Sequence, residues 1–145
     1  MARADFAVVY DDSVHWGETD MFGHINNVAY FRYIESARVK YMAEVLSVDF
    51  GPDSSDTCLL LDLQCRFISQ LHFPSDIEIG VRTERMGSKS FDLYSELFRK
   101  GEDSPFAVST AVLVWYDFTV QKTKPIPPEI RQKIIGLESV APREE

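Results

Sequence analysis

The chain has 145 residues, 45% of them hydrophobic and 12% aromatic, which suffices for one domain with an apolar core that needs neither disulfides nor metal. Its formal net charge of −8 argues against a nucleic-acid partner, which requires a basic face. No run approaches the roughly 18 apolar residues of a membrane span, and the first residues lack the apolar stretch of a signal peptide. We therefore expect a cytoplasmic protein with no membrane partner, formed by a single domain over residues 1–145.

The first elements are a strand, a polar loop and a helix. Alternating apolar side chains predict the strand over residues 6–16, and the loop DMFGHINN follows at residues 20–27. From residue 27 to about residue 46, apolar side chains recur at three- and four-residue steps, which is a helical period. Tyr30 and Tyr33 add apolar groups beside this stripe, so we expect other structure to enclose the helix on several sides. The stripe itself comprises Val28, Phe31, Ile34, Ala37, Arg38, Tyr41, Met42 and Val45.

Period-two alternation then predicts a series of strands. They cover residues 59–68, 74–86, 91–97 and 106–118, with a turn at residues 86–88. The last strand is apolar on both faces, which places it near the centre of a sheet. Two prolines and an acid before Ile130 predict a short helix, and residues 141–145 should fray.

This order of elements favours an α+β fold. One antiparallel sheet curled around one buried helix is the most economical packing, because the predicted helix is too apolar to lie against solvent. Such a sheet leaves an edge or a face uncovered. We therefore expect a homodimer formed edge to edge, or a dimer of dimers (a tetramer).

The segment WGETDMFGHINNVAYFRYIESAR, together with this arrangement, resembles the hotdog-fold acyl-CoA thioesterases of the 4-hydroxybenzoyl-CoA thioesterase type. The resemblance extends over nearly the whole chain and is most specific at residues 20–38, while MGSKSF at residues 86–91 matches the family's Gly-x-x-Ser hairpin. It implies the hotdog fold, an antiparallel sheet wrapped around a long central helix. It also implies hydrolysis of an acyl-CoA to a carboxylic acid and coenzyme A, with no metal or redox cofactor.

The resemblance also implies site residues. The acid matching Asp20 is the family's catalytic carboxylate, acting as nucleophile or by activating water. The helix start, here Asn27, supplies a backbone N–H to the thioester carbonyl, although some relatives carry histidine at this position. General physical chemistry agrees, because the first amides of a helix, such as those of Asn27 and Val28, lack intrahelical partners and carry positive charge. Gly23, without a Cβ, either lets the backbone approach a ligand or adopts a positive φ.

The same residues also have structural interpretations. An aspartate before a turn, such as Asp20, commonly bonds its own backbone, and the asparagine pair before the helix can act as a cap. His24 can orient water, bond the carbonyl or contact the sulfur, or serve only as a structural hydrogen-bonding residue. His15 and His72 show no ligand spacing with His24, so we expect no metal site.

Other residues are candidates for substrate binding. Tyr30 is the aromatic residue best placed to line an acyl tunnel. Arg85, Ser88, Lys89 and Ser90 have the chemistry to hold the phosphates or pantetheine of coenzyme A, or they form a polar hairpin tip. We expect the substrate at a subunit interface, where the helix start of one chain meets the hairpin of its partner.

Two rival functions remain open. One is a hotdog dehydratase or hydratase that uses Asp20 with His24 to move protons about a β-carbon. The other is an acyl-CoA-binding module without catalysis. The sequence leaves the acyl group undefined, and the acidic surface disfavours an acyl carrier protein as donor because that carrier is itself acidic.

Overall fold

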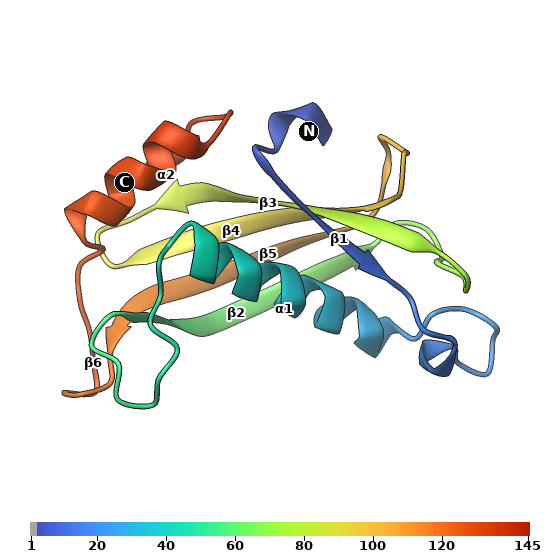
Figure 1. Ribbon diagram of the computed structural model, residues 1–145, viewed down its shortest axis with the longest axis horizontal. Coiled ribbons are helices and arrows are strands. Elements are labelled where there is room, and N and C mark those ends of the chain that lie inside the picture. Colours follow the sequence, from blue (N-terminus) through green and yellow to red (C-terminus); the bar gives the residue numbers. More distant parts are fainter. Residues whose placement is uncertain (1–2) are drawn as a thin grey trace.

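The computed structural model describes residues 3–145 and shows a strongly curved antiparallel sheet with a helix across its concave side (Figure 1). The main strands within this part of the chain are β1 (Val8–Ser13), β2 (Thr57–Phe67), β3 (Asp76–Met86), β4 (Ser90–Arg99) and β5 (Pro105–Asp117). They lie in the order β1-β3-β4-β5-β2. Short strands β6 (Lys122–Thr123) and β7 (Arg143–Glu144) pair with β5 and β3. The helices are α1 (Asn27–Glu44) and α2 (Pro128–Leu137).

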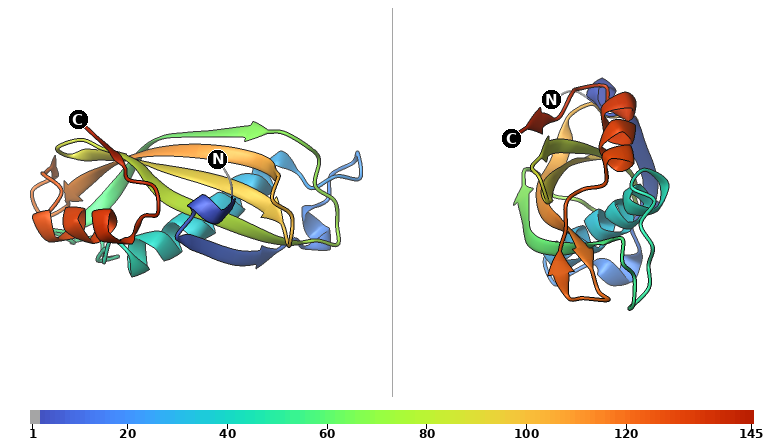
Figure 2. Two further views of the ribbon diagram at one scale, coloured as in Figure 1. Left: turned by 90° about the horizontal axis from the view of Figure 1, so that it is seen from above. Right: turned by 90° about the vertical axis from the view of Figure 1, so that its left-hand side faces the viewer.

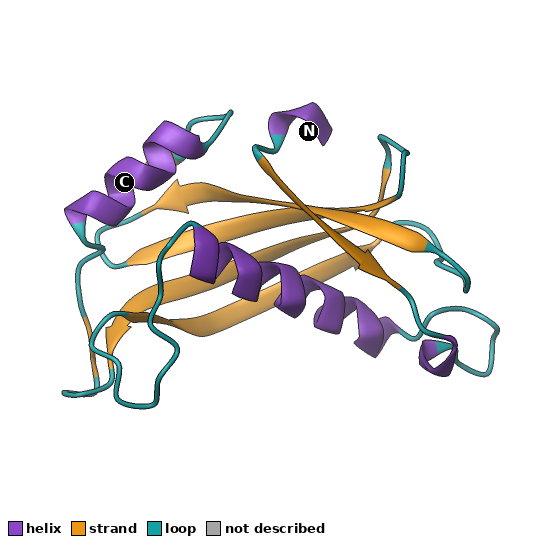
Figure 3. Cartoon of the chain, in the orientation of Figure 1, coloured by secondary structure: helices purple, strands orange, loops and turns teal. Residues whose placement is uncertain are grey.

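The curled sheet around a central helix confirms the predicted fold, and β5 lies between β4 and β2 as its two apolar faces indicate. Ile79, Leu93 and Leu113 are examples of the strand residues buried with α1 in the core. At one end of the sheet stands α2, far from the first turn of α1 (Figure 3). Neither α1 nor α2 is long and apolar enough to cross a membrane.

Helix α1 buries most of the predicted stripe, from Ile34 to Val45, but its first turns bury a different side. Tyr30 and Tyr33 are each only 3% exposed, whereas Val28 is 63% exposed. The sheet covers α1 from one side only, so the expectation of a helix enclosed on several sides is wrong for this chain. The helix has 18 residues and ends earlier than predicted, because the amides of Val45 and Leu46 both donate to the Tyr41 carbonyl.

Strand β1 is shorter than the predicted strand over residues 6–16. It ends at Ser13, which pairs with Asp76, the first residue of β3. Beyond that pair only the Val14 amide still bonds to the neighbouring segment, at the Ser75 carbonyl, and a short 3-10 helix over Trp16–Glu18 follows. The length of a strand is set by its partner, which a single-strand pattern does not reveal.

At the other end of β1, Phe6 packs on the face of the sheet that points away from α1. Its ring stacks on Tyr94 at 6.2 Å between centroids and meets Phe98 edge-on at 6.3 Å. Gly80 lies directly below, and a Cβ there would stand 2.5 Å from the Phe6 ring. The glycine is therefore required for this close approach.

The final residues do not fray as predicted. Arg143 and Glu144 form β7 in parallel with Arg85 and Met86 of β3, and the Glu145 amide donates to the Met86 carbonyl at 3.1 Å. The ladder between β1 and β3 reaches only Val81, so the part of β3 beyond Val81 is free to pair with the C-terminal tail, residues 143–145. The chain end consequently lies beside the end of β3 (Figure 2).

Candidate active site

A tight turn over residues 20–24 holds one oxygen of Asp20. The Asp20 amide donates to the His24 carbonyl at 2.8 Å, and the Gly23 amide donates back to the Asp20 carbonyl at 3.2 Å. The carboxylate Oδ1 accepts from the amides of Phe22 at 2.8 Å and His24 at 3.3 Å. Within residues 3–145 no hydrogen bond is assigned to Oδ2. One oxygen thus orients the half-buried carboxylate, and the other is available for chemistry.

Gly23 serves the turn through its backbone conformation. Its φ is +79°, in the left-handed region that other residues resist, and a Cβ would meet nothing within 4 Å. Of the two roles that the sequence allows for this glycine, the positive φ is therefore the one that the turn requires.

The start of α1 presents one open amide. Asn26 caps the helix, since its Oδ1 accepts from the Val28 amide at 3.0 Å and its carbonyl accepts from Ala29 at 2.9 Å. The predicted Val28 donor is thus already used. The Asn27 amide donates no assigned hydrogen bond anywhere in the described chain, so this residue carries the free N–H at the positive end of the helix.

Of the predicted site residues, Asp20, His24, Asn27 and Tyr30 line one cavity of about 570 Å³. At one wall the Tyr30 ring meets Phe67 edge-on, with 4.9 Å between centroids. Burial is the main cause that raises the pKa of the Tyr30 hydroxyl. The cavity therefore combines a polar end with an aromatic wall. Its lining residues are Asp20, Phe22, His24, Ile25, Asn27, Tyr30, Phe67, Ile68, Ser69 and Gln70.

A second hollow of about 440 Å³ also borders the first turns of α1, and the Val28 side chain lines it rather than the Asp20 cavity. Glu18 lies in its wall and is occupied by the fold, because its Oε1 accepts from the Tyr33 hydroxyl at 2.6 Å and the His15 amide at 2.7 Å. We assign this hollow no chemistry.

His72 contacts the Asp20 turn, which the sequence analysis missed. Its ring meets that of His24 at 4.8 Å between centroids, and its Nδ1 lies 3.4 Å from the Gly23 carbonyl oxygen. The two histidines are far apart in the chain, and no spacing pattern links them. In the part of the chain that the structure describes, no three His, Cys, Asp or Glu side chains gather as a metal site requires.

The turn between β3 and β4, which carries the predicted hairpin residues, lies at the opposite end of the sheet from the loop before α1 (Figure 1). Strand β2 has 11 residues and runs between the two ends. At about 3.3 Å per residue its span is roughly 33 Å. Within one chain, Arg85, Ser88, Lys89 and Ser90 therefore do not meet the cavity.

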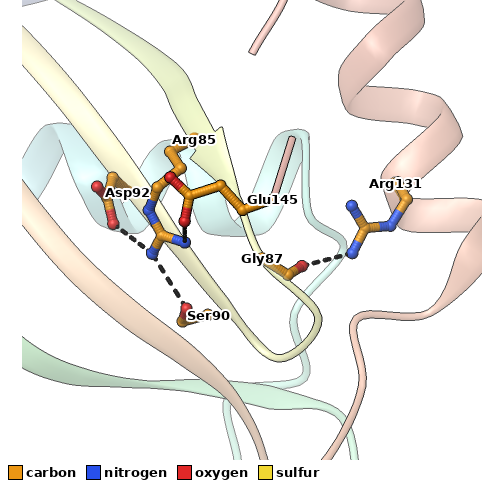
Figure 4. A network of polar contacts seen from close by, with 6 residues as sticks. All are labelled: Arg85, Gly87, Ser90, Asp92, Arg131 and Glu145. Atoms are coloured by element: carbon orange, nitrogen blue, oxygen red, sulfur yellow. Dashed lines mark hydrogen bonds and ion pairs between the residues drawn. The ribbon is translucent and has the colours of Figure 1, made fainter. Parts of the chain in front are cut away.

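Figure 4 shows how the hairpin is held. Arg85 Nη2 donates to Ser90 Oγ at 3.0 Å and Asp92 Oδ1 at 2.8 Å, and its Nη1 lies 3.6 Å from Glu145. The bond to Asp92 is the main cause that raises the pKa of Arg85. Arg131 donates to the Gly87 carbonyl at 2.6 Å. The side chains of Arg85 and Ser90 are thus occupied by hydrogen bonds within their own chain.

The side chains of Ser88 and Lys89, in contrast, are exposed and make no assigned polar contact within residues 3–145. Of the predicted hairpin residues, these two remain available to a ligand.

The curled sheet, the central helix and the cavity at its start define a hotdog-fold protein of the thioesterase type. Residues 14–134 match the model of the thioesterase-like superfamily, and the chain belongs to that family.

Known proteins agree with this assignment. The chain is similar to the PA5185 protein of Pseudomonas aeruginosa, with 27% identity, a TM-score of 0.85 and 97% of each chain covered. It is also similar to a thioesterase from Thermus thermophilus complexed with coenzyme A and Zn, with 26% identity, a TM-score of 0.79, and 94% and 97% of the two chains covered. The uncharacterized protein YsmA of Bacillus subtilis is 30% identical over 92 residues, 63% of this chain. The match covers 61% of that relative's length.

Proposed function

We propose that the protein hydrolyses acyl-CoA thioesters to a carboxylic acid and coenzyme A. One observation carries this proposal: Asp20 and Asn27, the residue with the open amide, line the same partly aromatic cavity. The coenzyme A bound to the Thermus thioesterase supports the choice of substrate class. A cytoplasmic location and a reaction without metal or redox cofactor complete the proposal.

The two groups divide the reaction between them. The Asn27 N–H and the helix dipole polarise the thioester carbonyl and stabilise the oxyanion as it forms. Oδ2 of Asp20 either attacks the carbonyl carbon, giving an anhydride that water then hydrolyses, or takes a proton from water as that water attacks. In both routes the C–S bond breaks, and the thiolate of coenzyme A leaves and gains a proton.

A second copy of the chain would complete the site. The edge strand β2 exposes Leu59, Leu60, Leu61 and its last residue Phe67, and the next residue, Ile68, is exposed as well. A two-fold axis at this edge would run β2 antiparallel to its copy. The partner's hairpin would then stand beside the Asp20 end, where Lys89 could meet the phosphates of coenzyme A. We therefore propose a homodimer as the active unit, alone or within a dimer of dimers.

The test is thiol release from a panel of saturated short, long and aromatic acyl-CoAs. Asp20→Ala should lower kcat on the order of 10²- to 10⁴-fold, the usual contribution of a positioned base. Asp53→Ala, at an exposed loop acid, is the matched control and should leave kcat unchanged. The proposal fails if wild type releases thiol no faster than Asp20→Ala. A dehydratase would leave the saturated substrates intact, and a binding module would retain them without turnover.

A further inference from the structure

His72 lies outside the lining of the Asp20 cavity yet contacts the turn that holds the carboxylate. Two hydrogen bonds hold the backbone at His72 and the residue before it. The Ser75 hydroxyl donates to the His72 carbonyl at 2.7 Å, and the preceding carbonyl, of fully buried Leu71, accepts from the Ile25 amide at 2.8 Å. The loop that carries His72 is thus tied to the segment between the turn and α1.

One peptide unit connects His72 with Asp20. The peptide between Gly23 and His24 directs its carbonyl oxygen to His72 Nδ1 at 3.4 Å and its N–H to Asp20 Oδ1 at 3.3 Å. A carbonyl oxygen can only accept, so Nδ1 of His72 carries the proton in this contact. Because a peptide unit is planar, fixing its oxygen also fixes the direction of its N–H.

The conformation of this peptide needs such support. Gly23 has a φ of +79°, and glycine leaves the unit more freedom to rotate than any other residue would. The other amide on Oδ1, from Phe22, belongs to an exposed residue, and the Phe22 side chain is 83% exposed. A contact from outside the turn therefore restricts the peptide that follows the glycine.

We propose that His72 is a positioning residue for thioester hydrolysis, an inference that rests on the proposed function. Its Nδ1–H holds the Gly23–His24 peptide, and that peptide holds Oδ1 of Asp20, so that Oδ2 faces the thioester. The edge-on contact with the His24 ring packs the histidine in place and is not itself needed for the rate.

Two variants separate the donor from the ring. His72→Asn keeps an N–H donor near the position of Nδ1 and loses the ring, while His72→Phe keeps the ring and loses the donor. His72→Phe should lower kcat about tenfold, the scale of a small misplacement of a catalytic group, with KM nearly unchanged. His72→Asn should retain most of kcat. Equal kcat for His72→Phe and wild type, or a larger loss in His72→Asn than in His72→Phe, overturns the proposal.

A measurement without substrate keeps this inference separate from the proposed function. The amide resonance of His24 in a ¹⁵N–¹H NMR spectrum reports the N–H that bonds Asp20. It should shift in His72→Phe and in Asp20→Ala, and stay near the wild-type position in His72→Asn. If wild type hydrolyses no acyl-CoA yet these shifts appear, the proposed function fails while the positioning contact stands. An unchanged resonance in His72→Phe overturns the contact itself.

Discussion

Tyr41 donates its hydroxyl proton to Oε2 of Glu138 across 2.7 Å, which joins α1 to the residue that ends α2. Both residues are buried, and the Thr83 amide of β3 donates to the same oxygen. The other oxygen of Glu138, Oε1, is buried without a hydrogen-bond partner among the described residues. Desolvation by burial is the main cause that raises the pKa of Glu138 above its ordinary value of 4.5.

This raised pKa predicts that Glu138 makes stability depend on pH. The fold favours the neutral carboxyl, so the contribution is complete below the ordinary pKa of 4.5 and is lost as pH rises through the raised value. Glu138→Gln keeps an acceptor for Tyr41 and cannot ionise. Denaturant titrations across this range should show wild type losing stability relative to Glu138→Gln as pH rises. Parallel curves for the two proteins would contradict the prediction.

The contact of Phe6 with Gly80 predicts a large effect from one methyl group. Gly80→Ala should displace the Phe6 ring and destabilise the protein by about 1–3 kcal/mol, as overpacking does. The measurement is the free energy of unfolding in urea. Gly136→Ala, on an exposed stretch of α2 with open space around it, is the control and should stabilise slightly because alanine favours a helix. If the free energy of unfolding of Gly80→Ala is as high as that of Gly136→Ala, the Phe6 ring moves away freely.

Loss of the Asn26 cap should affect stability and rate together. Asn26→Ala leaves the Val28 amide without its acceptor and should cost about 1 kcal/mol of stability. The freed N–H stands beside that of Asn27, and the frayed helix start should lower kcat. Asn26→Ser preserves a capping oxygen and should recover most of both properties in thermal unfolding and thiol-release assays. Full activity in Asn26→Ala would show that Asn27 needs no fixed helix start.

A shared site predicts complementation between two defective chains. Lys89→Glu should raise KM for acyl-CoA by up to about tenfold with little change in kcat, since an exposed ion pair contributes up to about 1 kcal/mol and reversal adds repulsion. Asp20→Ala should be nearly inactive. A mixture refolded together contains heterodimers in which one site has both residues intact. Below KM its activity should exceed the average of the separate proteins. Activity equal to that average would show that Lys89 does not act at the partner's site.

The sequence predicted the features that depend on local pattern. The period-two runs identified the strands, and the apolar character of both faces indicated an interior strand, as β5 is between β4 and β2. The polar loop before α1 pointed to Asp20 and Asn27, which line one cavity. Each of these signals lies within about twenty consecutive residues of the chain.

The features that were missed depend on contacts between distant segments. Val28 and Tyr30 both fit a helical stripe, and only the position of the sheet decides which side is buried. His72 reaches the turn through a loop after β2, and Arg85 is held by the facing strand and the tail. The tail itself pairs because β1 stops short on β3, which depends on where the two strands begin and end.

Two amides bond Oδ1 of Asp20, so the two oxygens of this carboxylate should behave differently in an isotope-labelling experiment. A carboxylate that cannot flip offers the same atom to every substrate molecule. If the acyl group passes through Asp20 and water attacks the aspartate carbon, repeated turnover in heavy-oxygen water can place at most one heavy atom on this side chain. A freely rotating carboxylate would acquire two heavy atoms. The mass of the peptide that contains Asp20 would therefore show whether the turn prevents rotation of the carboxylate.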